Sequence, residues 1–269
     1  MFSMATILVP VAFSPHCAWV ARYAVRLGKE FGSRLIFLHV GQDGETAALE
    51  EFLLAELGSR SHRSVTVDGD PADRIVALSQ EYQADLILMP TYRARFRLFL
   101  LGSVTAKVLH DARCPVLTGV HHYDGGTQMT DRIPNTFRSV VCALDETPDC
   151  VPLAEWAMAL TDSLKANLRF VHALPAVDEL SENCGEREVR RYLFEQARKR
   201  FAAHFAAAET QPTVDLRGGK ISTVVREAAL ADQADLVIIG RGQADRALGG
   251  LRTQTYSILR NSPCPVISV

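Results

Sequence analysis

The stretch Ile7-Leu8-Val9-Pro10-Val11-Ala12-Phe13-Ser14 decides the fold, because a second version of it lies further along the chain. That version is Val140-Val141-Cys142-Ala143-Leu144-Asp145-Glu146-Thr147, at an offset of 133 residues (residue 7 to residue 140). The same offset pairs 35–40 (LIFLHV) with 168–173 (LRFVHA). A constant offset across separate segments indicates an internal repeat.

The repeat continues at a larger offset in the later part of each copy. Gly69 corresponds to Gly219, and residues 114–116 (CPV) correspond to 264–266 (CPV), at an offset of 150. The 17 additional residues of the second copy therefore lie after its second strand. The chain is predicted to be two tandem copies of one structural unit.

Short apolar runs alternate with helical patterns in each copy. In the first copy the runs lie at about 6–12, 34–40, 63–68, 85–90 and 115–120. Short, nearly continuous apolar runs are typical of strands buried on both faces of a parallel sheet. Strands that alternate with helices predict an open, doubly wound parallel sheet with right-handed crossovers in each copy.

The segment 121–136 is polar, contains Gly and Pro, and shows no periodicity, which is typical of a linker. We therefore expect one domain at 1–120 and a second at 137–269. In the second copy the extra length is predicted to be helical. Its apolar residues recur every four positions and are expected to pack in the core: Val189, Leu193, Ala197, Phe201 and Phe205.

Composition narrows the classes of function. The chain has 269 residues, a net charge of −2, 48% hydrophobic residues and 22% charged residues. This balance gives no electrostatic footprint for nucleic acid or an anionic membrane. No apolar run approaches the roughly 20 residues of a membrane helix, and the six cysteines lack CxxC spacings. A reduced, cytoplasmic protein is expected.

Several motifs, taken together in their order and spacing, resemble the universal stress protein family over nearly the whole chain. They are ILVPVAFS (7–14), GDPADRIVAL (69–78), ADLILM (84–89), LLGSVTAKVLHDARCPVL (100–117), VVCALDET (140–147), GKIS (219–222), ADLVIIG (234–240) and NSPCPVISV (261–269). The resemblance implies a Rossmann-like, five-stranded parallel sheet of order 3-2-1-4-5 in each domain. It also implies, for a subset of members, binding of ATP with Mg²⁺.

In that subset an Asp after the first strand contacts the adenine and ribose side, and a G-x2-G-x9-G-(S/T) segment after the fourth strand surrounds the phosphates. Glycines let the backbone approach, and a helix N-terminus meets negative charge. In the second domain the resemblance implies these contact positions: Ala143, Asp145, Ala173, Ile239, Gly240, Gly242, Arg252 and Thr253. In the first domain it implies a degenerate set: Pro10, Val40, Gly102, Ser103 and Val104.

Both copies depart from the motif. In the first, Ala12 replaces the Asp, and Pro90 and Tyr92 replace the upstream glycines. In the second, Arg252-Thr253 replaces the final Gly-Ser pair, and the spacing is one residue short. The second domain is therefore the better candidate for a nucleotide site.

Each candidate feature also has a structural explanation. Asp145 either contacts a ribose or caps a helix that starts near Thr147, and Gly102-Ser103 either holds a phosphate or begins a helix with Ser as its N-cap. His39 and His172 occupy matching positions at the ends of second strands, which favours shared packing over catalysis. The arginines of one loop favour a solvated segment over an anion site: Arg93, Arg95 and Arg97.

Three functions are left open. The favoured one is a non-catalytic stress-response or regulatory module that binds an adenine nucleotide in the second domain. The alternative is an ATP-independent module that binds an unidentified protein partner, and the third is a slow ATPase. The chain contains no GxxxxGK[ST], GxSxG or HExxH motif. The last strands, at 115–120 and 265–269, are expected to pair the two domains within one chain, and a homodimer is a further possibility.

Overall fold

The computed structural model describes residues 2–41, 45–58, 62–90, 92–93, 99–100, 102–119, 133–178, 184–241 and 253–269. The chain divides into two compact units, Phe2–Thr136 and Phe137–Ile267, termed domain 1 and domain 2 below. Residues 121–132 of the expected linker lie outside the described residues. Among the described helices, none combines the length and apolar character needed to cross a membrane.

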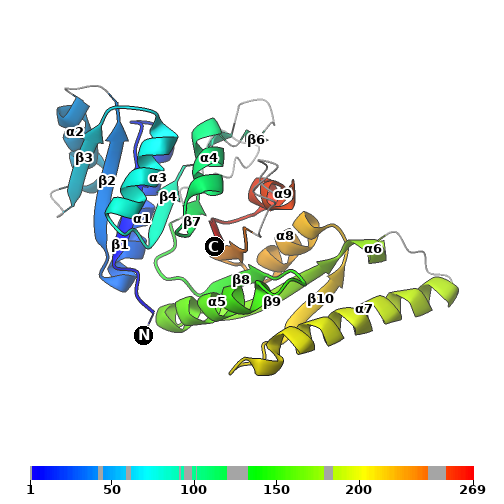
Figure 1. Cartoon of the computed structure of the whole chain (residues 1–269). Helices are drawn as coiled ribbons and strands as arrows, with labels where there is room; N and C mark the ends of the chain where they lie inside the picture. The colour runs from blue at the N-terminus through cyan, green and yellow to red at the C-terminus, as the bar shows by residue number, and fades with distance from the viewer. Residues whose placement is uncertain are drawn as a thin grey trace. The chain divides into compact units, whose positions relative to one another are not determined.

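Domain 1 is a parallel sheet with helices on both faces (Figure 1). The strand order is β3-β2-β1-β4-β7, which is the order 3-2-1-4-5. A short antiparallel pair, β5 (Tyr92–Arg93) and β6 (Phe99–Leu100), follows β4. The main elements are β1 (Thr6–Pro10), α1 (Pro15–Phe31), β2 (Arg34–Val40), α2 (Glu45–Leu57), β3 (Arg63–Val67), α3 (Pro71–Glu81), β4 (Leu86–Met89), α4 (Ser103–Asp111) and β7 (Val116–Thr118).

Domain 2 repeats this architecture, with the strand order β10-β9-β8-β11-β12. The order 3-2-1-4-5 is thus confirmed in both domains. The elements are β8 (Ser139–Ala143), α5 (Cys150–Leu164), β9 (Asn167–Leu174), α6 (Pro175–Asp178), α7 (Cys184–His204), a 3₁₀ turn (Phe205–Ala207), β10 (Val214–Gly218), α8 (Ile221–Ala231), β11 (Leu236–Ile239), α9 (Thr253–Asn261) and β12 (Val266–Ser268).

The central strands are apolar because they are covered on both faces. Every residue of β1, β4 and β11 is buried. Removing such runs from water contributes about 1.5–3 kcal/mol for each large aliphatic side chain. The same pattern explains why the strand positions were readable from the sequence.

Helix starts follow local chemistry. The side chain of Asp70 caps α3 by accepting a hydrogen bond from the Asp73 amide at 3.0 Å, and Pro71 occupies the first turn. Ser14 caps α1 in the same way through the Cys17 amide at 3.3 Å. Residues next to each helix therefore determine that α1 starts at residue 15 and α3 at residue 71.

The additional length of domain 2 forms the long helix α7 and the short helix α6. The C-terminal half of the expected apolar stripe packs as predicted, since Ala197, Phe201 and Phe205 are buried. Leu193 is partly buried against Leu174, Val177 and Ala197. Val189, however, is 46% exposed, so its assignment to the core was wrong. The N-terminal turns of α7 keep the apolar period, but within the described residues Val189 is not covered.

One aspartate ties the fourth strand to the start of the first in each domain. In domain 1 the Asp85 carboxylate accepts from the Thr6 amide at 2.9 Å, and the Asp85 amide donates to the Thr6 carbonyl at 2.9 Å. In domain 2 Asp235 accepts from the amides of Arg138 at 2.7 Å and Ser139 at 3.2 Å. These contacts fix the register of the central strand at its amino end.

We predict that Asp235→Ala and Asp85→Ala each lower the free energy of unfolding of their own domain by about 1.5–3 kcal/mol, the usual range for hydrogen bonds to a charged group. Asp235→Ala is expected to cost more, because it orphans two amides. Urea unfolding followed by fluorescence separates the domains, since Trp19 lies in α1 and Trp156 in α5. Asp68→Ala, which removes an exposed carboxylate, is the control, and equal midpoints for all variants would contradict the prediction.

Candidate functional site

A cavity of about 140 Å³ opens in domain 2 where β8, β9 and β11 end. This edge is where an open parallel sheet reverses its strand order, and ligands of such sheets bind there. The loop after β8 and the helices α5, α8 and α9 complete the wall. The lining residues are Ala143, Leu144, Asp145, Asp149, Leu153, Val171, His172, Ala173, Ile221, Val225, Ile239, Gly240, Gln254, Thr255 and Ile258.

The structure brings together most of the positions singled out in domain 2. Ala143, Asp145, Ala173, Ile239 and Gly240 all line the cavity. Gly242 and Arg252 lie outside the described residues. Thr253 is the first residue of α9, and its side chain is not described. The lining residues of α8 and α9, such as Val225 and Ile258, were not predicted from the sequence. The apolar face of each helix is the feature of the sequence that could have identified them.

Asp145 lies in a tight turn before α5. Its Oδ1 accepts from the Thr147 amide at 3.2 Å and from the Thr147 hydroxyl at 2.5 Å. The helix itself begins at Cys150, three residues later than expected. The local contact of Asp145 therefore orders the loop rather than the first turn of a helix, and the carboxylate still lines the cavity.

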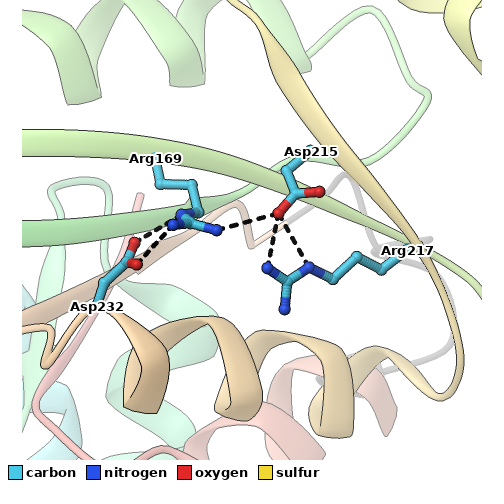
Figure 2. A network of polar contacts seen from close by, with 4 residues as sticks. All are labelled: Arg169, Asp215, Arg217 and Asp232. Carbon is cyan, nitrogen blue, oxygen red and sulfur yellow. Dashed lines mark hydrogen bonds and ion pairs between the residues drawn. The ribbon is translucent and has the colours of Figure 1, made fainter.

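A charged network holds the far end of α8 against the sheet (Figure 2). The guanidinium of Arg169 on β9 contacts both oxygens of Asp232, at 2.6 and 2.7 Å, and reaches Asp215 at 3.2 Å. Arg217 contacts the same oxygen of Asp215 at 2.8 and 2.9 Å. The network thereby joins β9, β10 and the C-terminal end of α8, the helix whose first turns line the cavity.

Domain 1 has apolar residues at the positions of this network. The repeat places Ile36, Val65, Val67 and Tyr82 where domain 2 has the four charged residues. Partly exposed ion pairs contribute less than their number suggests. The network is therefore a feature of domain 2 that fixes geometry more than it adds stability.

The matched histidines make matched contacts. His172 Nδ1 lies 2.8 Å from the Leu144 carbonyl, and His39 Nδ1 lies 2.8 Å from the Val11 carbonyl. A carbonyl only accepts, so Nδ1 carries the proton in both rings. Nε2 faces a carboxylate in each case, Glu146 at 3.5 Å and Glu45 at 3.0 Å. Each histidine thus joins the second strand to the loop after the first strand, which is the structural role expected from the repeat.

The corresponding edge of domain 1 has a different character. Pro10 and Val40 are the last residues of β1 and β2. Beyond them Phe13, at φ 50°, stacks on His39 with ring centroids 4.2 Å apart and contacts Phe52 edge-on at 5.9 Å. An aromatic cluster therefore stands in domain 1 where the repeat places Glu146 in domain 2.

A helix begins at Gly102-Ser103, as the sequence predicts, but the N-cap is not the serine. Gly102 is the N-cap of α4 and makes no side-chain cap, while Ser103 is the first helical residue and is exposed. Val104 follows and is half-buried. Of the three loop arginines, Arg93 lies in β5, and Arg95 and Arg97 lie outside the described residues.

The pKa of the thiol of Cys150, at the start of α5, is affected by two carboxylates of the cavity wall. Burial raises the pKa of its thiol from 9.0 to about 11, and the carboxylates of Asp145 and then Asp149 add to the increase. The repeat pairs it with Cys17, at the start of α1.

The fold and the cavity define an α/β protein with a cavity at the switch point of a parallel sheet. The family model described as "Universal stress protein family" matches residues 41–118 and 136–269. The chain belongs to the universal stress protein family.

Relatives and solved structures agree with this assignment. A universal stress protein of Methanothermobacter thermautotrophicus is 45% identical over 56 residues, which cover 21% of this chain and 38% of that protein. One of Methanocaldococcus jannaschii is 28% identical over 135 residues, covering 41% of this chain and 79% of that protein. The crystal structure of a universal stress protein from Archaeoglobus fulgidus covers 99% of this chain and 96% of that one, with a TM-score of 0.65 at 19% identity. That likeness shows the two-domain fold.

We predict that Asp145→Asn lowers the pKa of Cys150 from about 11 toward its ordinary value, because it removes a negative charge beside the thiol. The titration of the Cys150 Cβ resonance by carbon-13 NMR measures this directly. Asp68→Asn makes the same change in net charge in domain 1 and should leave the titration unchanged. An unaltered midpoint in Asp145→Asn would show that the carboxylate does not act on the thiol.

Proposed function

We propose that domain 2 binds an adenine nucleotide and that the protein acts as a non-catalytic regulatory module. The observation that carries this proposal is the cavity at the carboxyl ends of β8, β9 and β11, with Asp145 and Gly240 in its wall. A dry apolar cavity of roughly 150 Å³ accepts a benzene molecule. The 140 Å³ in domain 2 therefore suits one ring system, with the rest of the ligand outside it.

The lining supports a planar, apolar group in the cavity. Aliphatic side chains come from the strands β9 and β11 and from the helices α5, α8 and α9, among them Leu153, Val171, Val225, Ile239 and Ile258. Ligand pockets are mostly apolar with a few well-placed polar groups. An adenine ring matches this character.

Asp145 supplies the polar group expected for the sugar. A carboxylate is a strong hydrogen-bond acceptor that suits ribose hydroxyls, and Asp145 lies in the cavity wall. Gly240 directly follows the neighbouring strand β11 and has no Cβ, which lets a ligand approach the backbone. The resemblance assigns the phosphates, with any Mg²⁺ bound to them, to Gly242, Arg252 and Thr253, whose role stays a prediction.

The chemistry of the lining favours binding over turnover. Its titratable side chains within the described residues are Asp145, Asp149 and His172. His172 is held on one ring nitrogen by the Leu144 carbonyl and faces Glu146 with the other. Both ring nitrogens thus face groups of the protein, which favours a structural role for this ring.

Domain 1 is proposed to have a structural role. Ala12 provides no carboxylate, and the rings of Phe13, His39 and Phe52 pack together beside it. One nucleotide per chain is therefore expected. If neither domain binds nucleotide, the ATP-independent module for a protein partner becomes the better explanation.

We predict that isothermal titration calorimetry finds one adenine nucleotide bound per chain, and that Asp145→Ala weakens the affinity by about tenfold to a hundredfold, the value of one charged hydrogen-bond partner. Asp68→Ala should bind as the wild-type chain does. Adding ATP and Mg²⁺ at about 100 times the dissociation constant should stabilise domain 2 by roughly 2.7 kcal/mol. Native mass spectra without added mass and an unchanged melting curve would refute the proposal, and steady phosphate release that Asp145→Ala abolishes would indicate an ATPase.

A further inference from the structure

The loop after β8 is held on both sides of Asp145. On the near side the Leu144 amide donates to the Val171 carbonyl at 3.0 Å, and the Leu144 carbonyl accepts from His172 at 2.8 Å. Both partners belong to β9, which pairs with β8 on one edge and β10 on the other. Residue 144 therefore cannot move without breaking contacts to the sheet.

On the other side of Asp145, the loop is contacted by α7 through Glu146. Arg200 Nε lies 2.7 Å from one oxygen of Glu146, and its NH2 donates to the other at 2.9 Å. Such a bidentate pair fixes direction as well as distance. His204, one turn further along the helix, lies 3.0 Å through Nε2 from the Glu146 carbonyl, and only the ring can donate in that contact.

A third contact joins the two holders. His172 Nε2 faces Glu146 at 3.5 Å, and the His172 ring packs edge-on against Phe201 at 5.1 Å. Phe201 lies between Arg200 and His204 in sequence and is buried. The apolar anchor and the two polar contacts of α7 thus act on the same loop.

This arrangement is specific to domain 2. The repeat places Phe13 of domain 1 at the position of Glu146, so no carboxylate is available there for a helix to grip. The shorter helix α2 instead supplies Glu45 to His39. Arg200 and His204 are absent from the cavity wall, so the contacts that link them to the cavity run through the Glu146 loop.

We propose that Arg200 and His204 of α7 are positioning residues for Asp145, so that docking of α7 on the Glu146 loop and binding of a ligand in the cavity favour one another. The ligand half of this statement rests on the proposed function. The docking half stands on the contacts of Glu146 alone. Because coupling between sites is reciprocal, a ligand that fixes Asp145 also stabilises the docked C-terminal half of α7.

The test uses the full chain and three variants. Arg200→Ala removes the bidentate pair, Arg200→Lys keeps a single point charge, and Arg198→Ala is the matched control on the same exposed helix. We expect Arg200→Ala to weaken binding of ATP–Mg²⁺ by about 5–20-fold, within the usual range of coupling between sites. Arg200→Lys should recover part of the loss, and Arg198→Ala should bind as the wild-type chain does.

Hydrogen–deuterium exchange of the chain without nucleotide tests docking separately. Faster exchange in peptides covering residues 144–149 of Arg200→Ala, with unchanged exchange in domain 1, supports the proposal. Unchanged exchange there, or equal nucleotide affinity of all variants, overturns it. If the wild-type chain binds no nucleotide, the proposed function fails, while exchange of the loop still decides whether α7 positions it.

Discussion

The constraint on which the structure depends is the burial of the first strand of each domain. β1 lies between β2 and β4, β8 lies between β9 and β11, and β1 is buried along its whole length. Such a strand has partners on both edges and helices over both faces. The chain that follows it can therefore leave the sheet only at the strand's carboxyl end. The loop after it must therefore lie at the switch point, beside the ends of its two neighbours. Whatever residues follow the first strand become the wall of any site, which is how Asp145 reaches the cavity.

The two domains show how far one scaffold tolerates different side chains. The histidine that ties the second strand to the loop is present in both, with the same 2.8 Å contact to a carbonyl. Around it, domain 1 packs phenyl rings, whereas domain 2 places carboxylates and a long helix. The Arg169 network lies at positions where the repeat places uncharged residues in domain 1. Domain 2 thus has polar contacts of defined direction at positions where domain 1 has none of these charges.

The sequence predicted the features that depend on neighbouring residues, such as strands and helix caps. It did not predict contacts between residues that are far apart in the chain. Buried parallel strands appear as apolar runs, and caps such as Asp70 are encoded within three residues of the helix they begin. Together with the repeat, these signals predicted an open parallel sheet in each domain, whereas the order of the strands and several residues of the cavity came from the resemblance to the family. The contacts of Glu146 with Arg200 and His204 join positions 54 and 58 residues apart, and no spacing rule connects them. The prediction that Val189 is buried was wrong for a related reason. Val189 follows the helical period, but its burial depends on which residues pack against it, and the period alone does not determine that.

The aspartate that joins the fourth strand to the first has a consequence for biosynthesis. Its hydrogen bonds span 79 residues in domain 1 and 97 in domain 2, so the central strand of a domain gains its last partner only after most of that domain has been made. Contacts of such sequence separation are slow to form, because the loop they close is long. Domain 1 can complete its sheet while domain 2 is still emerging from the ribosome. Each half then has a period in which its most apolar strand has an open edge, and the nascent chain must be protected from aggregation at that stage.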